Sequence, residues 1–182
     1  MKLELTHTRT QSLPGGQTMV RFAQRHHGIP VLSRGASVLL VGRNAQALER
    51  AAQALGGRSA RVDWCAADLA TVAGRARVVE AASLWGGSGI NVLVNNAGCG
   101  DFGMLDEVDD AAIERMFAIN AIAPMQLTRA LLPTLRSQPT SAILNIGSVF
   151  GSLGYPGFTA YSATKFALRG FTEALRRELA DS

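Results

Sequence analysis

Three polar side chains in the last third of the sequence have the types and spacing that proton transfer requires. Tyr161 and Lys165 are four residues apart, so on a helix they lie on one face. Ser148 follows a strand-like run, residues 142–147, and a loop rich in glycine separates it from Tyr161. At the carboxyl end of a parallel strand, this hydroxyl, phenol and ammonium group can meet and form a proton-transfer site.

The spacing also predicts how the tyrosine works near neutral pH. A free phenol has a pKa of about 10, which is high for acid–base catalysis at neutral pH. A lysine cation one helical turn away favours the phenolate, so we expect Lys165 to lower the pKa of Tyr161. Tyr161 can then exchange a proton with a carbonyl or alcohol oxygen that Ser148 holds. The alternative is an ordinary surface pair of tyrosine and lysine, with a serine cap upstream.

The composition restricts the class of protein. A chain of 182 residues with 47% hydrophobic and 18% charged residues is typical of one globular domain. The net charge of +4 is scattered, so we expect no nucleic-acid partner. The sequence has no membrane-length apolar run and no signal-peptide core, which predicts a soluble, cytoplasmic protein. The three histidines form no ligand set, so no metal is expected, and Cys65 and Cys99 are expected to be free thiols.

Strands and helices alternate from residue 37 onward. The expected strands span residues 37–41, 59–66, 90–94 and 142–147. The expected helices span residues 44–55, 71–85, 109–135 and 159–180, and the third of them bends at Pro124. This alternation predicts right-handed crossovers and an α/β fold with a doubly wound parallel sheet, which is a Rossmann-like three-layer α/β/α sandwich.

The two ends of the sequence fit this pattern less well. Residues 1–34 are irregular, and a short helix over residues 17–25 is the clearest element expected there. The sequence stops directly after the last expected helix, where an open sheet would normally gain further strands. We therefore expect residues 1–182 to form a single Rossmann-type domain whose sheet is incomplete at both ends.

From about residue 35 to residue 182, an ordered series of motifs resembles the short-chain dehydrogenase/reductase family. The series starts with Gly42-Arg43 after one strand, Asp68-Leu69 after the next, and the turn Asn95-Asn96-Ala97-Gly98. Asn120 on the long helix and the set of Ser148, Tyr161 and Lys165 complete it. The resemblance implies an oxidoreductase that transfers a hydride between a nicotinamide cofactor and a small carbonyl or secondary alcohol substrate.

The resemblance also implies roles for the catalytic residues. Tyr161 would be the acid/base and Ser148 would hold the substrate oxygen. Lys165 would lower the pKa of Tyr161 and bind the nicotinamide ribose. Asn120 would connect Lys165 to solvent through water.

For the cofactor, the resemblance implies that Asp68 and Leu69 lie against the adenine. Asn95, Ala97 and Gly98 would support the sheet centre and border the adenosine ribose. The alternatives are a plain strand-ending turn for residues 95–98 and a helix-capping role for Asp68.

The residue after the first clear strand bears on the choice of cofactor. A carboxylate at this position would accept hydrogen bonds from the ribose hydroxyls of NAD, but the sequence has Gly42-Arg43-Asn44. A guanidinium suits a 2′-phosphate, which favours NADP over NAD. The alternative is an exposed arginine that stacks loosely on the adenine.

The sequence departs from the family pattern in two places. The glycine-rich phosphate motif that opens the family is absent, and Gly15-Gly16 is its nearest counterpart. The family's C-terminal substrate segment does not follow the last helix. A second hypothesis is therefore a non-catalytic remnant that binds nucleotide weakly or only self-associates. Family members usually form dimers through the helices that start near Asp109 and Thr159, so a homo-oligomer is expected.

Overall fold

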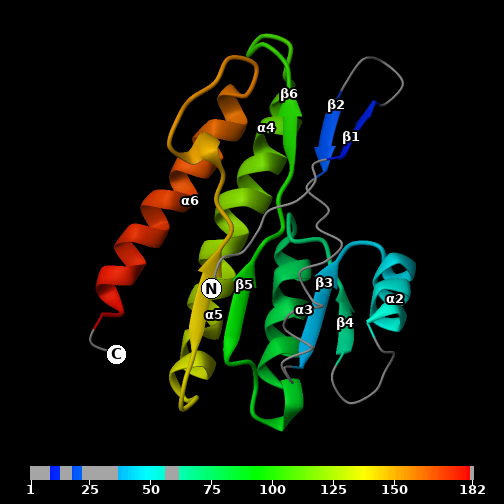
Figure 1. Ribbon diagram of the computed structural model, residues 1–182, viewed down its shortest axis with the longest axis vertical. Coiled ribbons are helices and arrows are strands. Elements are labelled where there is room, and N and C mark those ends of the chain that lie inside the picture. Colours follow the sequence, from blue (N-terminus) through cyan, green and yellow to red (C-terminus); the bar gives the residue numbers. More distant parts are fainter. Residues whose placement is uncertain (1–8, 13–17, 22–36, 56–61, 181–182) are drawn as a thin grey trace.

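The structure is a computed structural model that describes residues 9–12, 18–21, 37–55 and 62–180 (Figure 1). Two parallel strand pairs form its centre. Strand β3 (Val38–Gly42) pairs with β4 (Val62–Ala66), and β5 (Val92–Asn95) pairs with β7 (Ala142–Asn145). All four strands lie within two residues of, or inside, their predicted ranges, and the fold is a Rossmann-like α/β fold.

The first strands replace a predicted helix. Strand β1 (Arg9–Ser12) pairs antiparallel with β2 (Thr18–Arg21), which pairs in turn with β6 (Gly100–Phe102). The helix predicted over residues 17–25 is therefore wrong, because four of its residues form β2 and three of these pair with the distant strand β6. The β-branched residues Thr18 and Val20 suit a strand. Gly15-Gly16 lies outside the described residues.

The helices begin at the residues that the sequence indicates. Helix α2 (Ala45–Ala54) is capped by Asn44, α3 (Val72–Ser83) by Thr71, and α4 (Asp110–Phe117) by Asp109. Each capping side chain accepts a backbone N–H, at 2.9, 3.0 and 2.6 Å respectively. A short 3₁₀ turn, η1 (Trp85–Gly87), follows α3, and a second, η3 (Val149–Gly151), follows Ser148. The last helix is α6 (Thr159–Glu178).

The long helix predicted over residues 109–135 is interrupted in the middle. A π-helical turn, η2 (Ala118–Ile122), separates α4 from α5 (Ala123–Arg136). Pro124 has no N–H to donate to the carbonyl oxygen of Asn120, four residues before it, so the regular α-helical pattern cannot continue there. The irregularity predicted at the proline is thus a widened turn that contains Asn120.

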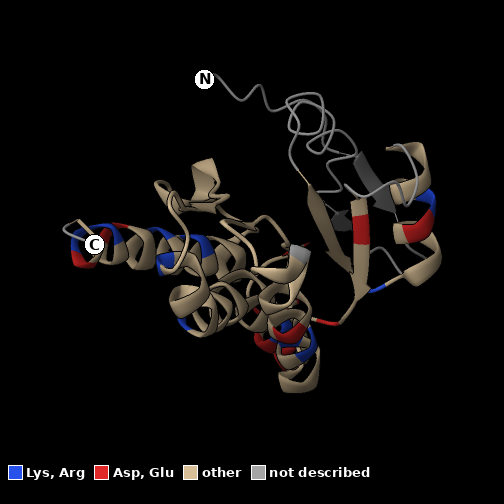
Figure 2. Cartoon of the chain, turned by 90° about the horizontal axis from the view of Figure 1, so that it is seen from below, with Lys and Arg blue, Asp and Glu red and all other residues tan. Residues whose placement is uncertain are grey.

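The two strand pairs share one layer of helices. One core cluster contains Cys65, Ala67, Val78 and Leu127, and another contains Ala82, Leu93, Leu131 and Leu135. Leu39 of β3 packs against both clusters, so α3 and α5 cover strands from both pairs. Helix α6 contacts α4 and η2 and extends this layer. Figure 2 shows that acidic and basic residues are mixed along α2 and α6.

Candidate active site

Ser148, Tyr161 and Lys165 come together where β7 ends and α6 begins. The Tyr161 side chain is 3% exposed and forms a hydrogen bond with the Ser148 side chain. The Lys165 side chain, 5% exposed, places Nζ 5.7 Å from the centre of the Tyr161 ring. Its Nζ donates a hydrogen bond to the carbonyl oxygen of Ile146, just after β7, at 3.1 Å.

The pKa of Tyr161 differs from the prediction in direction. Burial raises the pKa of Tyr161, and the hydrogen bond from Ser148 opposes this rise only in part. Burial also lowers the pKa of Lys165. The net direction is therefore opposite to the predicted lowering, because desolvation of the phenolate dominates. At neutral pH, Tyr161 is a protonated phenol.

The Asn120 side chain links three segments around this site. Its Oδ1 accepts the N–H of Cys99 at 2.9 Å, and its Nδ2 donates to the carbonyl of Cys99 at 2.7 Å. Its Nδ2 also donates to the hydroxyl of Thr164 at 3.0 Å, and that hydroxyl donates to the carbonyl of Tyr161 at 2.7 Å. Asn120 thus fixes the loop after β5 to the second turn of α6.

Thr164 is a buried member of the candidate site that the sequence reasoning missed. It is fully buried, and it stands three residues after Tyr161, so its hydroxyl can reach back to the Tyr161 carbonyl. A polar residue between Tyr161 and Lys165 was the available signal. The sequence alone does not show that this hydroxyl accepts from Asn120 and donates to the carbonyl of Tyr161.

Gly98 lies between Asn120 and Lys165. A Cβ atom at Gly98 would be 3.4 Å from Asn120 Oδ1 and 3.7 Å from Lys165 Nζ. A side chain larger than a methyl group would therefore fill the space beside the lysine ammonium. The turn after β5 approaches the catalytic residues closely because this position has no side chain.

Asp68 has a partner that the sequence did not indicate. Its carboxylate accepts from Arg115 on α4 at 3.2 Å and from the N–H of Ala70 at 3.1 Å. Burial raises the pKa of Asp68, but these two donors, together with the charges of Arg115 and Arg43, outweigh burial and the net pKa is lowered. Thr71, not Asp68, caps α3. Leu69 is half-buried, and its carbonyl accepts from the buried Arg75 at 2.7 Å.

The remaining predicted cofactor residues divide into buried and exposed ones. Asn95 is 7% exposed, and its Nδ2 donates to Asn145 Oδ1 of the neighbouring strand at 2.8 Å. Its side chain therefore supports the sheet centre and is not open to a ligand. Ala97 and Arg43 are exposed, at the ends of β5 and β3. The ends of three strands thus present a cation, a carboxylate and a turn without bulky side chains.

These groups fit the two nucleoside ends of a nicotinamide dinucleotide. Arg43 and Asp68 offer a donor and an acceptor at one end, and the space at Gly98 beside Lys165 lies at the other. Within the described residues, no group of three or more histidine, cysteine, aspartate or glutamate side chains could hold a metal ion. Cys65 and Cys99 are free thiols.

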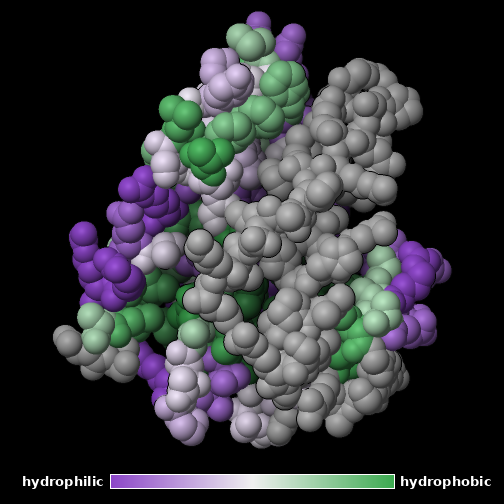
Figure 3. Space-filling model, viewed as in Figure 1, coloured by the Kyte–Doolittle hydropathy of each residue, from purple (hydrophilic) through white to green (hydrophobic). Residues whose placement is uncertain are grey.

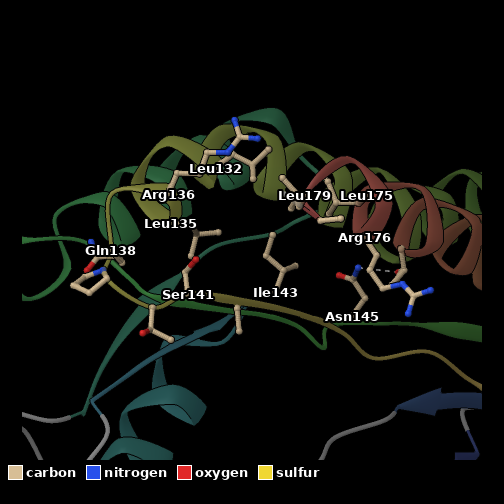
Figure 4. Close-up of a pocket in the computed structure, with 15 residues that line it drawn as sticks. Leu132, Leu135, Arg136, Gln138, Ser141, Ile143, Asn145, Leu175, Arg176 and Leu179 are labelled. Atoms are coloured by element: carbon tan, nitrogen blue, oxygen red, sulfur yellow. Dashed lines mark hydrogen bonds between the residues drawn. The ribbon is translucent and has the colours of Figure 1, made fainter. Parts of the chain in front are cut away.

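A large hollow in the structure lies away from these residues. It has a volume of about 820 Å³ and lies between α5, β7 and α6, on the edge of β7 opposite β5. Figure 4 shows Leu132 and Leu135 of α5, Leu175 of α6 and Leu179 just after α6 facing Ile143 of β7 across it. None of Ser148, Tyr161 and Lys165 lines this hollow, so it is separate from the candidate active site.

The α/β fold and the grouping of these side chains define the class of protein to compare with, and comparison with known proteins identifies the family. The sequence profile described as "short chain dehydrogenase" matches residues 29–182. The chain therefore belongs to the short-chain dehydrogenase family.

The curated relatives extend well beyond the matched part. Dehydrogenase/reductase SDR family member 7B of Mus musculus is 33% identical over 155 residues, which cover 81% of this chain and 47% of the relative. The NADP-dependent 3-hydroxy acid dehydrogenase of Schizosaccharomyces pombe is 43% identical over 96 residues, covering 51% of this chain and 36% of the relative. The chain thus spans half or less of the length of these relatives.

Solved structures show the same fold. A short-chain dehydrogenase from Streptomyces avermitilis has a TM-score of 0.74 at 32% identity, covering 82% of this chain and 54% of that one. A short-chain dehydrogenase from Sphingobium yanoikuyae, in complex with NADPH, has a TM-score of 0.73 at 32% identity. The match covers 81% of this chain and 57% of that one. No described helix has the length and apolarity to cross a membrane.

Proposed function

We propose that the chain carries the catalytic part of an NADP(H)-dependent oxidoreductase that acts on a carbonyl or secondary alcohol substrate. The observation that carries this proposal is the contact of Tyr161 with Ser148, with Lys165 packed against the same ring. NADPH, when bound, supplies the hydride. Ser148 and Tyr161 then hold the oxygen of the substrate from two sides.

The protonation state of Tyr161 favours reduction. A carbonyl that receives a hydride becomes an alkoxide, and Tyr161 donates the proton that converts it to an alcohol. Because burial raises its pKa, Tyr161 is protonated throughout the neutral range and ready to donate. Oxidation of an alcohol needs the phenolate, so the rate of oxidation should increase as the pH rises towards this raised pKa.

Arg43 supports a preference for NADP. It is exposed at the end of β3, beside Asn44, whose side chain is engaged in capping α2. The two residues directly after β3 therefore offer a cation and no carboxylate. The relative from Schizosaccharomyces pombe is named as NADP-dependent, and the neighbour from Sphingobium yanoikuyae binds NADPH.

A second candidate function is nucleotide binding without turnover. The sequence lacks the glycine-rich phosphate motif, and the chain spans half or less of its curated relatives. A weak phosphate contact would leave the adenosine and ribose ends as the main source of affinity. We also propose self-association through α4, η2 and α6, where Ile122 and Phe166 are 42% and 44% exposed, and the molar mass in solution tests this.

Replacement of Tyr161 by phenylalanine tests the enzymatic proposal. NADPH consumption by the whole chain is measured over a panel of ketones, and binding is measured by NADPH fluorescence. We expect Tyr161→Phe to lower the turnover number by roughly 10²- to 10⁴-fold with little change in NADPH affinity. The control is Leu84→Ala, at a 72% exposed side chain just after α3, which should keep full turnover.

The outcomes separate the two candidate functions. NADPH binding with no turnover by the unmodified chain would favour nucleotide binding alone. Turnover that Tyr161→Phe leaves unchanged would contradict the role given to Tyr161.

A further inference from the structure

A group of exposed apolar side chains lies beside the candidate active site. Six large side chains from residues 100–107 and 148–159 are each more than half exposed, and we call them the apolar shelf: Phe102, Met104, Leu105, Val149, Leu153 and Tyr155. Figure 3 shows hydrophobic residues gathered at the end of the molecule where Figure 1 places β6 and the loop before α6. Large exposed apolar side chains that gather at one end of a molecule often mark a binding site.

The two segments of the shelf are fixed to each other. The N–H of Gly103 donates to the carbonyl of Gly157 at 3.0 Å, and the rings of Phe102 and Phe158 are 5.1 Å apart. Gly157 has a φ of +77°, and a Cβ atom there would come within 2.6 Å of the Phe102 ring. Both the conformation and the close approach require glycine, so the backbone holds Phe102 against the second segment.

A second layer of rings connects the shelf to Tyr161. Phe150 and Phe158 are half-buried, with ring centres 6.2 and 6.1 Å from that of Tyr161. Phe150 also stacks on Tyr155 of the shelf at 5.6 Å. An apolar group on the shelf is therefore one aromatic ring away from the proposed proton donor.

The charges around the shelf select against anionic ligands. Residues 100–107 and 148–159 contain no lysine or arginine, and their charged residues are Asp101, Asp106 and Glu107. Arg169 of α6 donates to Ser152 at 3.1 Å but is already paired with Glu173 at 2.8 Å. A carboxylate or phosphate on the shelf would lie near acidic side chains without a free basic partner in these segments.

We propose that the apolar shelf binds the hydrophobic part of the substrate, and that the substrate is a neutral ketone or secondary alcohol with an aromatic or long apolar group. This inference rests on the proposed function, because it assumes that the reacting oxygen lies at Tyr161. The aromatic layer positions the apolar group, and the acidic residues disfavour keto acids and phosphorylated substrates.

Calorimetric titration of the whole chain tests the shelf with three ketones: acetone, para-methylacetophenone and para-acetylbenzoate. The last two have the same size and differ in charge. The Tyr161→Phe chain is used with NADPH present, so that binding is measured independently of turnover. We expect para-methylacetophenone to bind at least about tenfold more tightly than either other ketone, as burial of one aromatic ring allows.

Two variants locate the binding surface. Phe102→Ala should weaken the binding of para-methylacetophenone by about tenfold. Val149→Ser, which leaves the contact between Phe102 and Gly157 intact, should weaken it by roughly threefold. Leu84→Ala, equally exposed but at the far end of α3, should leave it unchanged. Circular dichroism checks that each variant is folded.

Three results of the ketone titrations would overturn the proposal. These are equal affinities for the three ketones, tighter binding of para-acetylbenzoate, and no binding of any ketone. A loss of affinity in Leu84→Ala equal to that in Phe102→Ala would also overturn it. A chain that binds para-methylacetophenone as expected but shows no Tyr161-dependent turnover would contradict the proposed function and leave the shelf supported.

Discussion

The catalytic end and the adenosine end of the candidate site are built in different ways. At the catalytic end, Asn120, Thr164 and Lys165 are at most 5% exposed, and each makes hydrogen bonds inside the protein. At the adenosine end, Arg43 and Ala97 are exposed, and the side chains of Asp68 and Arg115 are 34% and 39% exposed. One end is fixed by the fold, whereas the other presents groups to a ligand.

This difference predicts which quantity each residue controls. Buried hydrogen-bonded groups cost free energy when a partner is lost, so substitutions at the catalytic end should change stability as well as turnover. Exposed groups contribute little to folding, so substitutions at the adenosine end should change affinity for the cofactor alone. If substitutions at both ends change stability, turnover and cofactor affinity in the same way, this distinction between the two ends is wrong.

The largest effect is expected for Asn120→Ala. This change removes three buried hydrogen bonds, two to the Cys99 backbone and one to Thr164. At about 1 kcal/mol for each bond, the free energy of unfolding should fall by about 3 kcal/mol. Urea denaturation followed by circular dichroism measures this loss.

Asn91→Ala is the matched control. Asn91 is exposed and donates one long bond, at 3.4 Å, to the carbonyl of Thr140, so its replacement should cost less than about 0.5 kcal/mol. Equal losses in the two variants would mean that the Asn120 network does not hold the catalytic end together.

The next effect is expected for Arg43→Ala at the adenosine end. A hydrogen bond to a charged group contributes roughly 1.5–3 kcal/mol, so the affinity for NADPH should fall by about tenfold or more. The affinity for NADH and the free energy of unfolding should change little, because Arg43 is exposed. Fluorescence titration with both cofactors gives the two affinities.

Arg50→Ala, at an exposed arginine on α2, controls for the loss of one positive charge. It should leave both affinities unchanged. Equal losses of NADPH and NADH affinity in Arg43→Ala would remove Arg43 as the determinant of cofactor choice and would favour stacking on the adenine.

Local signals explain why most of the fold could be predicted from the sequence. The apolar run at residues 37–41 and the caps Asn44, Thr71 and Asp109 depend on neighbouring residues, and all of them appear where expected. Strand β2 could not be predicted in this way, because it exists by pairing with β6 about 80 residues later. The intrinsic propensity of a residue for strand or helix has a weaker effect than pairing with such a partner strand.

The candidate site was predictable in its members but not in its electrostatics. The spacing of Tyr161 and Lys165 places both on one side of α6, as expected. It does not show that Lys165 donates to the carbonyl of Ile146, nor that the phenol is buried. Those two facts reverse the predicted direction of the pKa of Tyr161, because desolvation depends on every segment packed around the ring.

The smallest effect is expected for Ser148→Ala on the titration of Tyr161. The chain has two tyrosines, so in a Tyr155→Phe background the tyrosinate absorbance reports Tyr161 alone. Burial raises the pKa of Tyr161 and the hydrogen bond from Ser148 lowers it, so removal of the hydroxyl should raise this pKa further. Reduction needs the protonated phenol, and its rate falls as the pH rises through this pKa. That fall should therefore begin at a higher pH in Ser148→Ala.

Ser152→Ala is the control. The hydroxyl of Ser152 accepts a hydrogen bond from Arg169, so its removal should leave the pKa of Tyr161 unchanged. A lower pKa in Ser148→Ala would show that Ser148 does not stabilise the phenolate, and the catalytic end would then lack the contact on which its proposed chemistry depends.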